Sequence, residues 1–150
     1  MFREFYENEF SGAKAACGFN PKAAETIHTL QNRGLRLILA TNPLFPAVAT
    51  ENRIRWAGLT PGDFELYTTY ENSCHCKPNP DYYRDILAQI GADPAQCLLV
   101  GKDAVEVVAA GQLGMKVFLL TDCLINKDGK DLSAYPQGSF DELLTYIESL

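Results

Sequence analysis

Apolar residues recur along this chain with two alternating spacings, and the alternation predicts its fold class. Short, nearly continuous apolar runs, typical of buried strands, stand at 35–41, 64–69, 97–100 and 116–120. Apolar residues at helical spacing predict helices at 21–33, 46–56, 80–90, 105–113 and 140–150. Strands separated by helices pair in parallel, and strands that are apolar on both faces need cover on both faces. We therefore expect an α/β fold, a doubly wound, Rossmann-like parallel sheet with flanking helices.

Local signals indicate where several of these helices begin and end. Asn20 is a good N-cap, and Pro21 after it suits the first helical position. Gly34 follows the last apolar residue of the same helix and predicts its C-terminal end. Ser139 is followed three residues later by Glu142, the spacing of a capping box. These signals fix the first and last of the predicted core helices most firmly.

Charge and hydropathy exclude two classes of partner. The net charge is −6 and no basic run occurs, whereas nucleic-acid binding needs clustered Lys and Arg. No apolar stretch approaches the roughly 20 residues that cross a bilayer. The first residues show no signal-peptide pattern. We therefore expect a cytoplasmic protein that binds neither nucleic acid nor membrane.

The five cysteines are odd in number and irregularly spaced, which favours free thiols in a reducing compartment. Two of them flank a histidine in Cys74-His75-Cys76. A zinc site usually takes four ligands at recognisable spacing, and no second ligand pair accompanies this segment. A structural metal here is the weaker interpretation.

Polar residues follow three predicted strands, where open α/β sheets place their ligands. Thr41 and Asn42 could hold a phosphoryl oxygen, although an ordinary turn is the alternative interpretation. Lys77 precedes a rigid Pro-x-Pro segment, which suits a cation that must meet a charged group at a fixed place. Asp103 and Glu106 lie three residues apart at a helix start and could hold Mg²⁺. Their alternative role is to complement the helix dipole.

In this order, the three segments resemble the haloacid dehalogenase superfamily, and the resemblance covers roughly residues 20–123. Thr41, after an apolar strand, resembles the second motif of the superfamily. Lys77 in Lys-Pro-Asn-Pro, with Tyr83 after it, resembles the third motif. Leu-Leu-Val-Gly at 98–101, with Asp103 and Glu106, resembles the fourth. Three motifs in register carry more weight than any one of them.

The resemblance implies a Mg²⁺-dependent phosphatase that acts on a small phosphorylated metabolite through an aspartyl-phosphate. Thr41 would then hydrogen-bond the transferring phosphoryl group, with support from Asn42. Lys77 would neutralise charge on the nucleophile and the phosphate. Asp103, together with Glu106, would hold Mg²⁺.

The first motif of such enzymes, Asp-x-Asp-x-Thr/Val, has no counterpart here, because no aspartate precedes Asp63. Its first aspartate is the nucleophile and its second the acid and base. We therefore expect this sequence to be the later part of a longer protein and to be inactive alone. Residues 1–19, with aromatic residues including Phe2 and Phe5, would then be the tail of a helical cap, and residues 20–150 the core.

Two further departures favour a different class of function. Lys102 stands where the fourth motif usually has an acid or Asn, and Val107 where related sequences carry an acid. Both weaken the expectation of metal binding. The alternative is therefore a non-catalytic, degenerate member that binds a ligand or partner. A receiver-like signalling domain is less consistent, because Thr41 occupies the best position for its phosphoacceptor aspartate.

The missing first motif also has a structural consequence. In this family its strand lies between the strand ending near Thr41 and the strand ending at Val100. Without it each of the two strands has an unpaired edge, and such edges recruit other strands. We expect low stability, direct pairing of the two strands, or completion by a strand from another chain.

Overall fold

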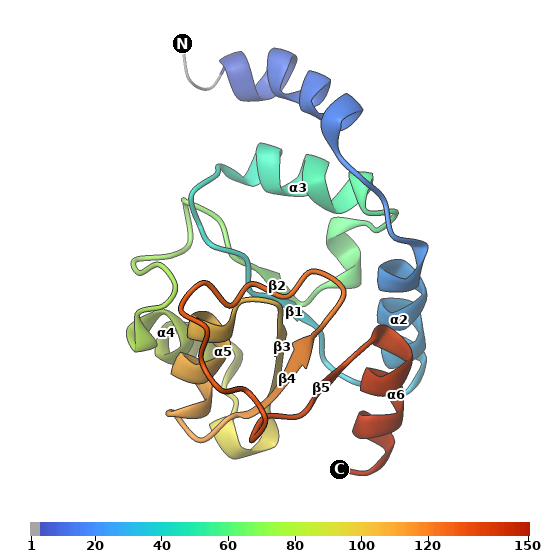
Figure 1. The fold of residues 1–150 in the computed structure, drawn as a ribbon. Helices are drawn as coiled ribbons and strands as arrows, with labels where there is room; N and C mark the ends of the chain where they lie inside the picture. Colours follow the sequence, from blue (N-terminus) through green and yellow to red (C-terminus); the bar gives the residue numbers. More distant parts are fainter. Residues whose placement is uncertain (1–3) are drawn as a thin grey trace. The chain divides into compact units, whose positions relative to one another are not determined.

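The computed structural model describes residues 4–150 (Figure 1), so Phe2 of the predicted N-terminal helix lies outside the described residues. The chain divides into two compact units. We call them the N-terminal unit, Met1–Cys76, and the C-terminal unit, Lys77–Leu150. Within residues 4–150, no helix has both the length and the apolar character needed to cross a membrane.

The N-terminal unit contains a two-stranded parallel sheet, in which Ile38 pairs with Leu66 and Leu39 with Tyr67. Its elements are the π-helical turn η1 (Phe5–Glu9), the 3-10 helix η2 (Phe10–Ala16), α2 (Pro21–Asn32), β1 (Ile38–Leu39), α3 (Ala47–Trp56), the 3-10 turn η3 (Pro61–Asp63) and β2 (Leu66–Tyr67).

The start of α2 confirms the predicted N-cap. The Asn20 side chain accepts a hydrogen bond from the Lys22 backbone amide, and Pro21 is the first helical residue. Gly34 follows the helix with a φ of +75°, a conformation that glycine adopts without steric cost.

Strands β1 and β2 are shorter than predicted, because a strand is defined by its paired backbone. Among residues 4–150, β1 has only β2 as a strand partner. The backbone hydrogen bonds continue beyond the two paired positions. Glu65 N donates to Leu37 O at 2.9 Å, and Thr68 N donates to Leu39 O at 3.1 Å. The apolar runs at 35–41 and 64–69 therefore do lie side by side, although only their centres form a regular ladder.

The residues before α2 are anchored on α3 by aromatic rings. The ring centroids of Tyr6 and Phe45 are 6.2 Å apart, and those of Phe10 and Trp56 are 5.4 Å apart and stacked. Figure 1 shows this segment running beside α3. The predicted amphipathic helix is thus present as η1 and η2 rather than as a regular α-helix. Its aromatic side is the side that packs.

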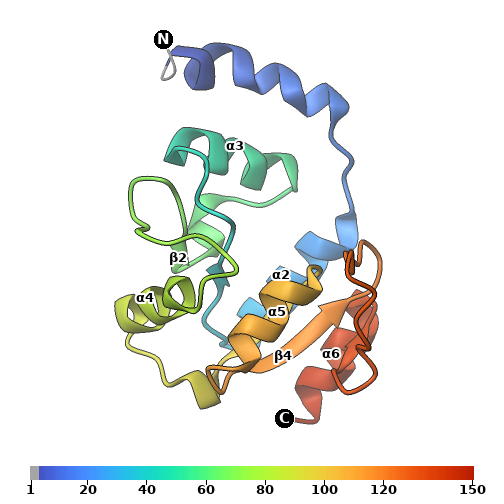
Figure 2. The same cartoon turned by 60° about the vertical axis from the view of Figure 1, so that its left-hand side comes forward.

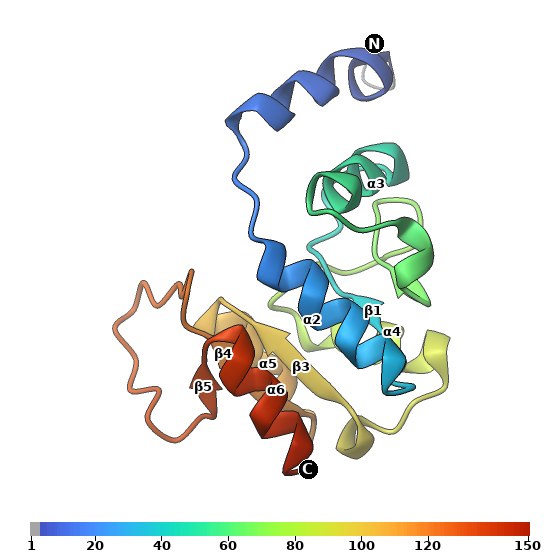
Figure 3. The same ribbon diagram turned by 90° about the vertical axis from the view of Figure 1, so that its right-hand side faces the viewer.

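The C-terminal unit contains a three-stranded parallel sheet with strand order β3-β4-β5. Helices α5 and α6 lie on opposite sides of this sheet (Figures 2 and 3). The elements of the unit are α4 (Pro80–Ile90), the 3-10 turn η4 (Pro94–Gln96), β3 (Leu98–Gly101), α5 (Ala104–Gly111), β4 (Lys116–Leu120), β5 (Gln137–Gly138) and α6 (Phe140–Glu148).

The core of the C-terminal unit lies around β4, the middle strand. Val117, Phe118 and Leu119 are buried, as are Val107 on α5 and Leu143 on α6. Burying each such side chain stabilises the fold by roughly 1.5–3 kcal/mol before entropy is counted. Strand β3, at one edge, is only half-buried along its length.

Strand β5 was not predicted, because Gln137–Gly138 has no apolar run. Its pairing comes from the register with β4, where Leu119 aligns with Gln137. Gly138 is required by space as well, since a Cβ there would lie 2.6 Å from a carboxylate oxygen of Glu142. The capping box of Ser139 and Glu142 that starts α6 is present as predicted.

The parallel strands and the helices between them confirm the α/β class. The two sheets remain separate, and within residues 4–150 β3 has β4 as its only strand partner. Direct pairing of the strands ending near Thr41 and Val100 would join the two units, and it stays a prediction. An edge strand can stay unpaired without a desolvation cost as long as water solvates its backbone polar groups.

Candidate functional site

Thr41 and Asn42 begin the loop that leads from β1 to α3 in the N-terminal unit, and both are half-buried. The loop is tightly turned. Thr41 N donates to Leu39 O at 3.1 Å, and Leu44 N donates to Asn42 O at 2.8 Å. This places the threonine directly at the carboxyl end of β1, where open parallel sheets position ligand-binding residues.

The loop after β2 lies against this first loop. The Thr68 hydroxyl donates to the Thr41 carbonyl oxygen, and the Glu71 carboxylate accepts from the Ala47 backbone amide. Neither Thr68 nor Glu71 was predicted from the sequence as a site residue. The available signal was the run Thr-Thr-Tyr-Glu at 68–71, which begins within the last two residues of a predicted strand.

In the C-terminal unit the structure brings Lys77 and Glu106 together. The Lys77 Nζ lies 2.7 Å from Glu106 Oε2, and the two side chains are 14% and 27% exposed. Charge-assisted hydrogen bonds of this length are about twice as strong as neutral ones. The structure thus places the Lys77 ammonium group on the carboxylate of Glu106. The predicted contact of Lys77 with a phosphate or a nucleophile stays a prediction.

Helix α4 holds the lysine segment in place from the other side. The Asn79 side chain caps the helix by accepting from the Asp81 backbone amide at 2.9 Å, and Pro80 is the first helical residue. Tyr83 lies one turn further on, buried, and its hydroxyl donates to the Glu106 carbonyl oxygen at 2.9 Å. Burial, and then the nearby carboxylate of Glu106, raise the pKa of Tyr83, so the hydroxyl stays protonated and remains a donor.

Asp103 is the N-cap of α5. Its Oδ1 accepts from the backbone amides of Val105 at 2.9 Å and Glu106 at 3.4 Å. The same loop is tied to residue Ile125, which donates its amide to the Lys102 carbonyl oxygen at 2.7 Å and accepts from Ala104 N at 3.0 Å. The carboxylate of Asp103 is therefore fixed in orientation and half-exposed.

The two residues that depart from the fourth motif have different surroundings. Val107 is 1% exposed, and its Cγ2 lies 2.7 Å from where a Cβ on Gly101 would stand. An acid at this position would place an unpaired charge in the core. Lys102 is exposed, so water screens its charge. The structure thus gives Val107 a packing role.

Asp103 fits the metal that the resemblance implies. Its Oδ1 is used for capping, and Oδ2 lies outside these hydrogen bonds. Mg²⁺ is often held by one or two protein carboxylates, with water and substrate phosphate completing the shell. Glu106 fits less well, because its carboxylate lies on Lys77. Residues 4–150 contain no group of three or more His, Cys, Asp or Glu side chains that could hold a metal.

Within residues 4–150 none of the five cysteines forms a disulfide, and four of them are exposed. Cys74-His75-Cys76 forms no group of three or more possible metal ligands within residues 4–150.

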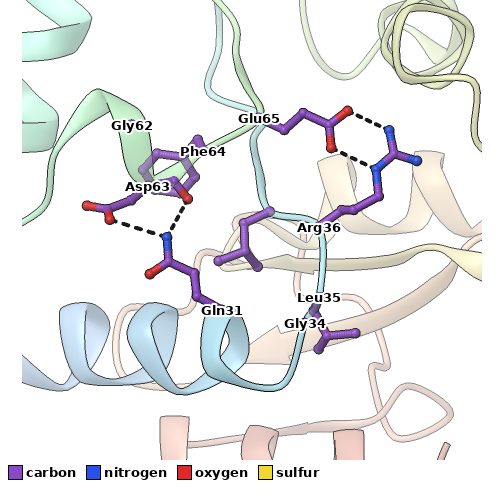
Figure 4. A pocket seen from close by; sticks show the side chains of 9 residues that line it. Gln31, Gly34, Leu35, Arg36, Gly62, Asp63, Phe64 and Glu65 are labelled. Carbon is purple, nitrogen blue, oxygen red and sulfur yellow. Dashed lines mark hydrogen bonds and ion pairs between the residues drawn. The ribbon is translucent and has the colours of Figure 1, made fainter.

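The pocket drawn in Figure 4, a hollow of about 340 Å³, lies at the amino ends of β1 and β2, away from the carboxyl-end loops. Its polar side chains satisfy one another. The guanidinium of Arg36 donates to both carboxylate oxygens of Glu65, and the Gln31 amide donates to Asp63. A hollow lined by paired groups offers little to a charged ligand.

The predicted site residues therefore fall into two sets. Lys77, Asp103 and Glu106 are brought together in the C-terminal unit, and Thr41 and Asn42 belong to the N-terminal unit.

A model of haloacid dehalogenase-like hydrolases matches residues 5–114, more than half of the 150-residue chain. The chain belongs to this family. The matched span includes the loops that carry Thr41, Lys77 and Asp103, so the residues behind the resemblance lie inside it. The predicted family is confirmed.

The chain is similar to several curated proteins and solved structures. Pyrophosphatase PpaX from Bacillus velezensis is 28% identical over 111 residues, which are 74% of this chain and 49% of the pyrophosphatase. A predicted phosphoglycolate phosphatase from Haemophilus somnus has the same fold, with a TM-score of 0.71 at 23% identity over 85% of this chain and 56% of that protein. CbbY from Rhodobacter sphaeroides, solved in complex with phosphate, has a TM-score of 0.70 at 21% identity. The match covers 89% of this chain and 60% of CbbY.

These structural likenesses confirm the Rossmann-like fold of the family. The chain spans about half the length of the curated relatives it matches.

Proposed function

We propose that this chain supplies the phosphate-binding, cationic and metal-binding side of a phosphatase that hydrolyses phosphate monoesters through an aspartyl-phosphate. The observation that carries the proposal is the Lys77–Glu106 ion pair held beside Asp103, in a member of the haloacid dehalogenase-like hydrolase family. Transfer of a charged phosphoryl group requires a fixed cation close to a carboxylate of fixed orientation, here the one that caps α5.

Each residue then has a distinct role. Lys77 neutralises charge on the nucleophile and on the phosphoryl oxygens, and Glu106 keeps its ammonium group in one place. Thr41 donates its hydroxyl to a phosphoryl oxygen, with Asn42 supporting it. Asp103 holds Mg²⁺ through the oxygen not used for capping, with Glu106 as a weaker second candidate. Mg²⁺, when bound, would neutralise phosphoryl charge and orient the phosphate.

The nucleophile is the role that residues 1–150 do not fill, because no aspartate precedes Asp63. We propose that it lies on a strand outside this sequence and that residues 1–150 alone are inactive. That strand, from the rest of the protein or from another chain, would pair with the half-buried edge strand β3. Residues 1–19 would be the tail of a helical cap and residues 20–150 the core.

The substrate is proposed to be a small phosphorylated metabolite, encountered in the cytoplasm. The similarity to a pyrophosphatase and to a predicted phosphoglycolate phosphatase supports this class of compound.

The test is an assay of a panel of phosphate monoesters and pyrophosphate with Mg²⁺. Residues 1–150 alone are expected to give no turnover. The same residues fused behind the first-motif strand and cap of a family member are expected to give Mg²⁺-dependent release of phosphate. A folded fusion protein that hydrolyses nothing on the panel would contradict the proposal.

The same assay addresses the second candidate function, a non-catalytic, degenerate member that binds a phosphate ligand or a partner. The missing nucleophile and buried Val107 favour it. An in-frame Asp-x-Asp-x-Thr segment encoded upstream of Met1 would exclude it. A fusion protein that binds orthophosphate without any turnover would support it.

A further inference from the structure

The loop that carries Thr41 is hydrogen-bonded to a buried threonine, Thr68, from the loop after β2. The Thr68 hydroxyl donates to the Thr41 carbonyl oxygen at 2.5 Å, and the Thr68 backbone amide donates to Leu39 O at 3.1 Å. Thr68 is 1% exposed, so water cannot replace this bond. The Thr41 carbonyl and the Asn42 amide belong to one planar peptide group. The Thr68 hydroxyl therefore orients the Asn42 N–H as well.

A second hydrogen-bonded contact lies at the other end of the same loop. Both carboxylate oxygens of Glu71 accept from the Ala47 backbone amide, at 3.1 and 3.0 Å, and Ala47 is the first residue of α3. Between these two contacts, Tyr70 N donates to Phe45 O at 2.9 Å. The segment 68–71 thus holds the segment 41–47 at three points.

Glu71 is charged in this position. Burial alone would raise the pKa of Glu71, but hydrogen bonds from the Thr69 side chain and the Ala47 amide outweigh burial and lower it. A carboxylate at a helix N-terminus is also favoured by the helix dipole. Because Glu71 already places a negative charge at the start of α3, a phosphate would be repelled from that helix end. Recognition then falls to Thr41 and the Thr41–Asn42 peptide group.

We propose that Thr68 is a positioning residue for phosphate recognition, because it fixes the Thr41–Asn42 peptide group, and that Glu71 fixes the other end of the same loop at the start of α3. The inference rests on the proposed function of Thr41. It goes beyond that function because neither residue touches the phosphate in this account.

The experiment uses residues 1–150 and inorganic orthophosphate, followed through the backbone amide signals of Thr41 and Asn42 in NMR titrations. Thr68→Val keeps the shape of the side chain and removes the hydroxyl, and Thr68→Ser keeps the hydroxyl. Thr145→Val is the matched control, because its exposed hydroxyl bonds only within α6, to the Asp141 carbonyl oxygen.

The wild type is expected to show saturable shifts at both amides. Thr68→Val should weaken orthophosphate binding about tenfold, the effect of one lost net hydrogen bond. Thr68→Ser should stay within about threefold of the wild type, and the control should not change. A merely structural role would lower the melting temperature of Thr68→Val and leave the affinity of the folded protein unchanged.

Amide hydrogen exchange without phosphate provides the second readout. Thr68→Val should speed exchange at Leu44. Glu71→Gln should speed exchange at Ala47 about fivefold, as expected for a weakened helix cap.

The outcomes separate the two proposals. Saturable binding by the wild type with equal affinity in Thr68→Val overturns the positioning role of Thr68 and leaves the proposed function standing. Unchanged exchange at Ala47 in Glu71→Gln overturns the role of Glu71. No shift at Thr41 or Asn42 in the wild type overturns the phosphate-binding role of Thr41 itself, and the positioning roles with it.

Discussion

Replacing either partner of the Lys77–Glu106 ion pair should destabilise the C-terminal unit, and replacing both should cost less than the sum of the two. The variants are Lys77→Met, Glu106→Gln and their double combination. Each single change leaves the remaining side chain, which is largely shielded from water, without the opposite charge that it meets at 2.7 Å.

The size of the coupling follows from distance and exposure. Two unit charges 2.7 Å apart attract by roughly 6 kcal/mol at an effective dielectric of 20 and by about 1.5 kcal/mol in bulk water. Side chains that are 14% and 27% exposed lie between these limits, and desolvation offsets much of the attraction. We expect a net coupling energy of about 1–2 kcal/mol.

The measurement is a double-mutant cycle by urea unfolding at pH 7, followed by far-ultraviolet circular dichroism. The matched control is the cycle of Arg84 and Asp81 on α4, whose side chains are 61% and 49% exposed. That exposed pair should couple by no more than about 0.5 kcal/mol. Equal coupling in the two cycles, or a Lys77–Glu106 coupling below about 0.5 kcal/mol, would refute the reasoning.

Three further changes test other parts of the structure. Tyr83→Phe removes a buried hydrogen bond and should lower the free energy of unfolding by about 1 kcal/mol in urea; an unchanged midpoint would contradict the assigned bond. Gly101→Ala should cost roughly 1–3 kcal/mol in thermal unfolding, because its Cβ would meet Val107 Cγ2. Adding Val107→Ala should recover part of that loss, and strictly additive losses would argue against the clash. Glu142→Gln should destabilise α6 at neutral pH, where the hydrogen bond from the Ser139 amide lowers the pKa of Glu142. Since this folded-state pKa lies below the unfolded value of about 4.3, the stabilisation is present above that pH and is lost as the pH falls through the folded value. The deficit of the variant should therefore shrink towards acid, and a deficit independent of pH would contradict the assignment.

The helices could be predicted because their signals are local. Asn20, Asn79 and Ser139 each cap a helix with their own side chains, and no distant residue is needed to make that bond. The order of the polar loops after the strands could also be predicted, since each loop directly follows an apolar run.

The strands and the details of the site were harder, because they depend on partners far away in the sequence. Strand β5 is defined by its pairing with β4, and Gln137–Gly138 has no apolar run from which a strand could be predicted. Glu106 was expected to bind metal, but its carboxylate lies on Lys77, which is 29 positions earlier in the chain. The metal role of Asp103 stays a prediction. Its side chain caps α5, whereas the sequence suggested only an interaction with the helix dipole as the alternative role.

The most direct test of the proposed phosphatase is the kcat/KM of the Lys77→Met variant in the fusion protein that supplies the first motif. If Lys77 stabilises charge on the transferring phosphoryl group, kcat/KM should fall by at least about a hundredfold, mostly through kcat. Arg84→Met, an equally large change on the exposed side of α4, should leave kcat/KM within about threefold of the wild type. A Lys77→Met variant that is folded and retains the wild-type kcat/KM would contradict the proposed function.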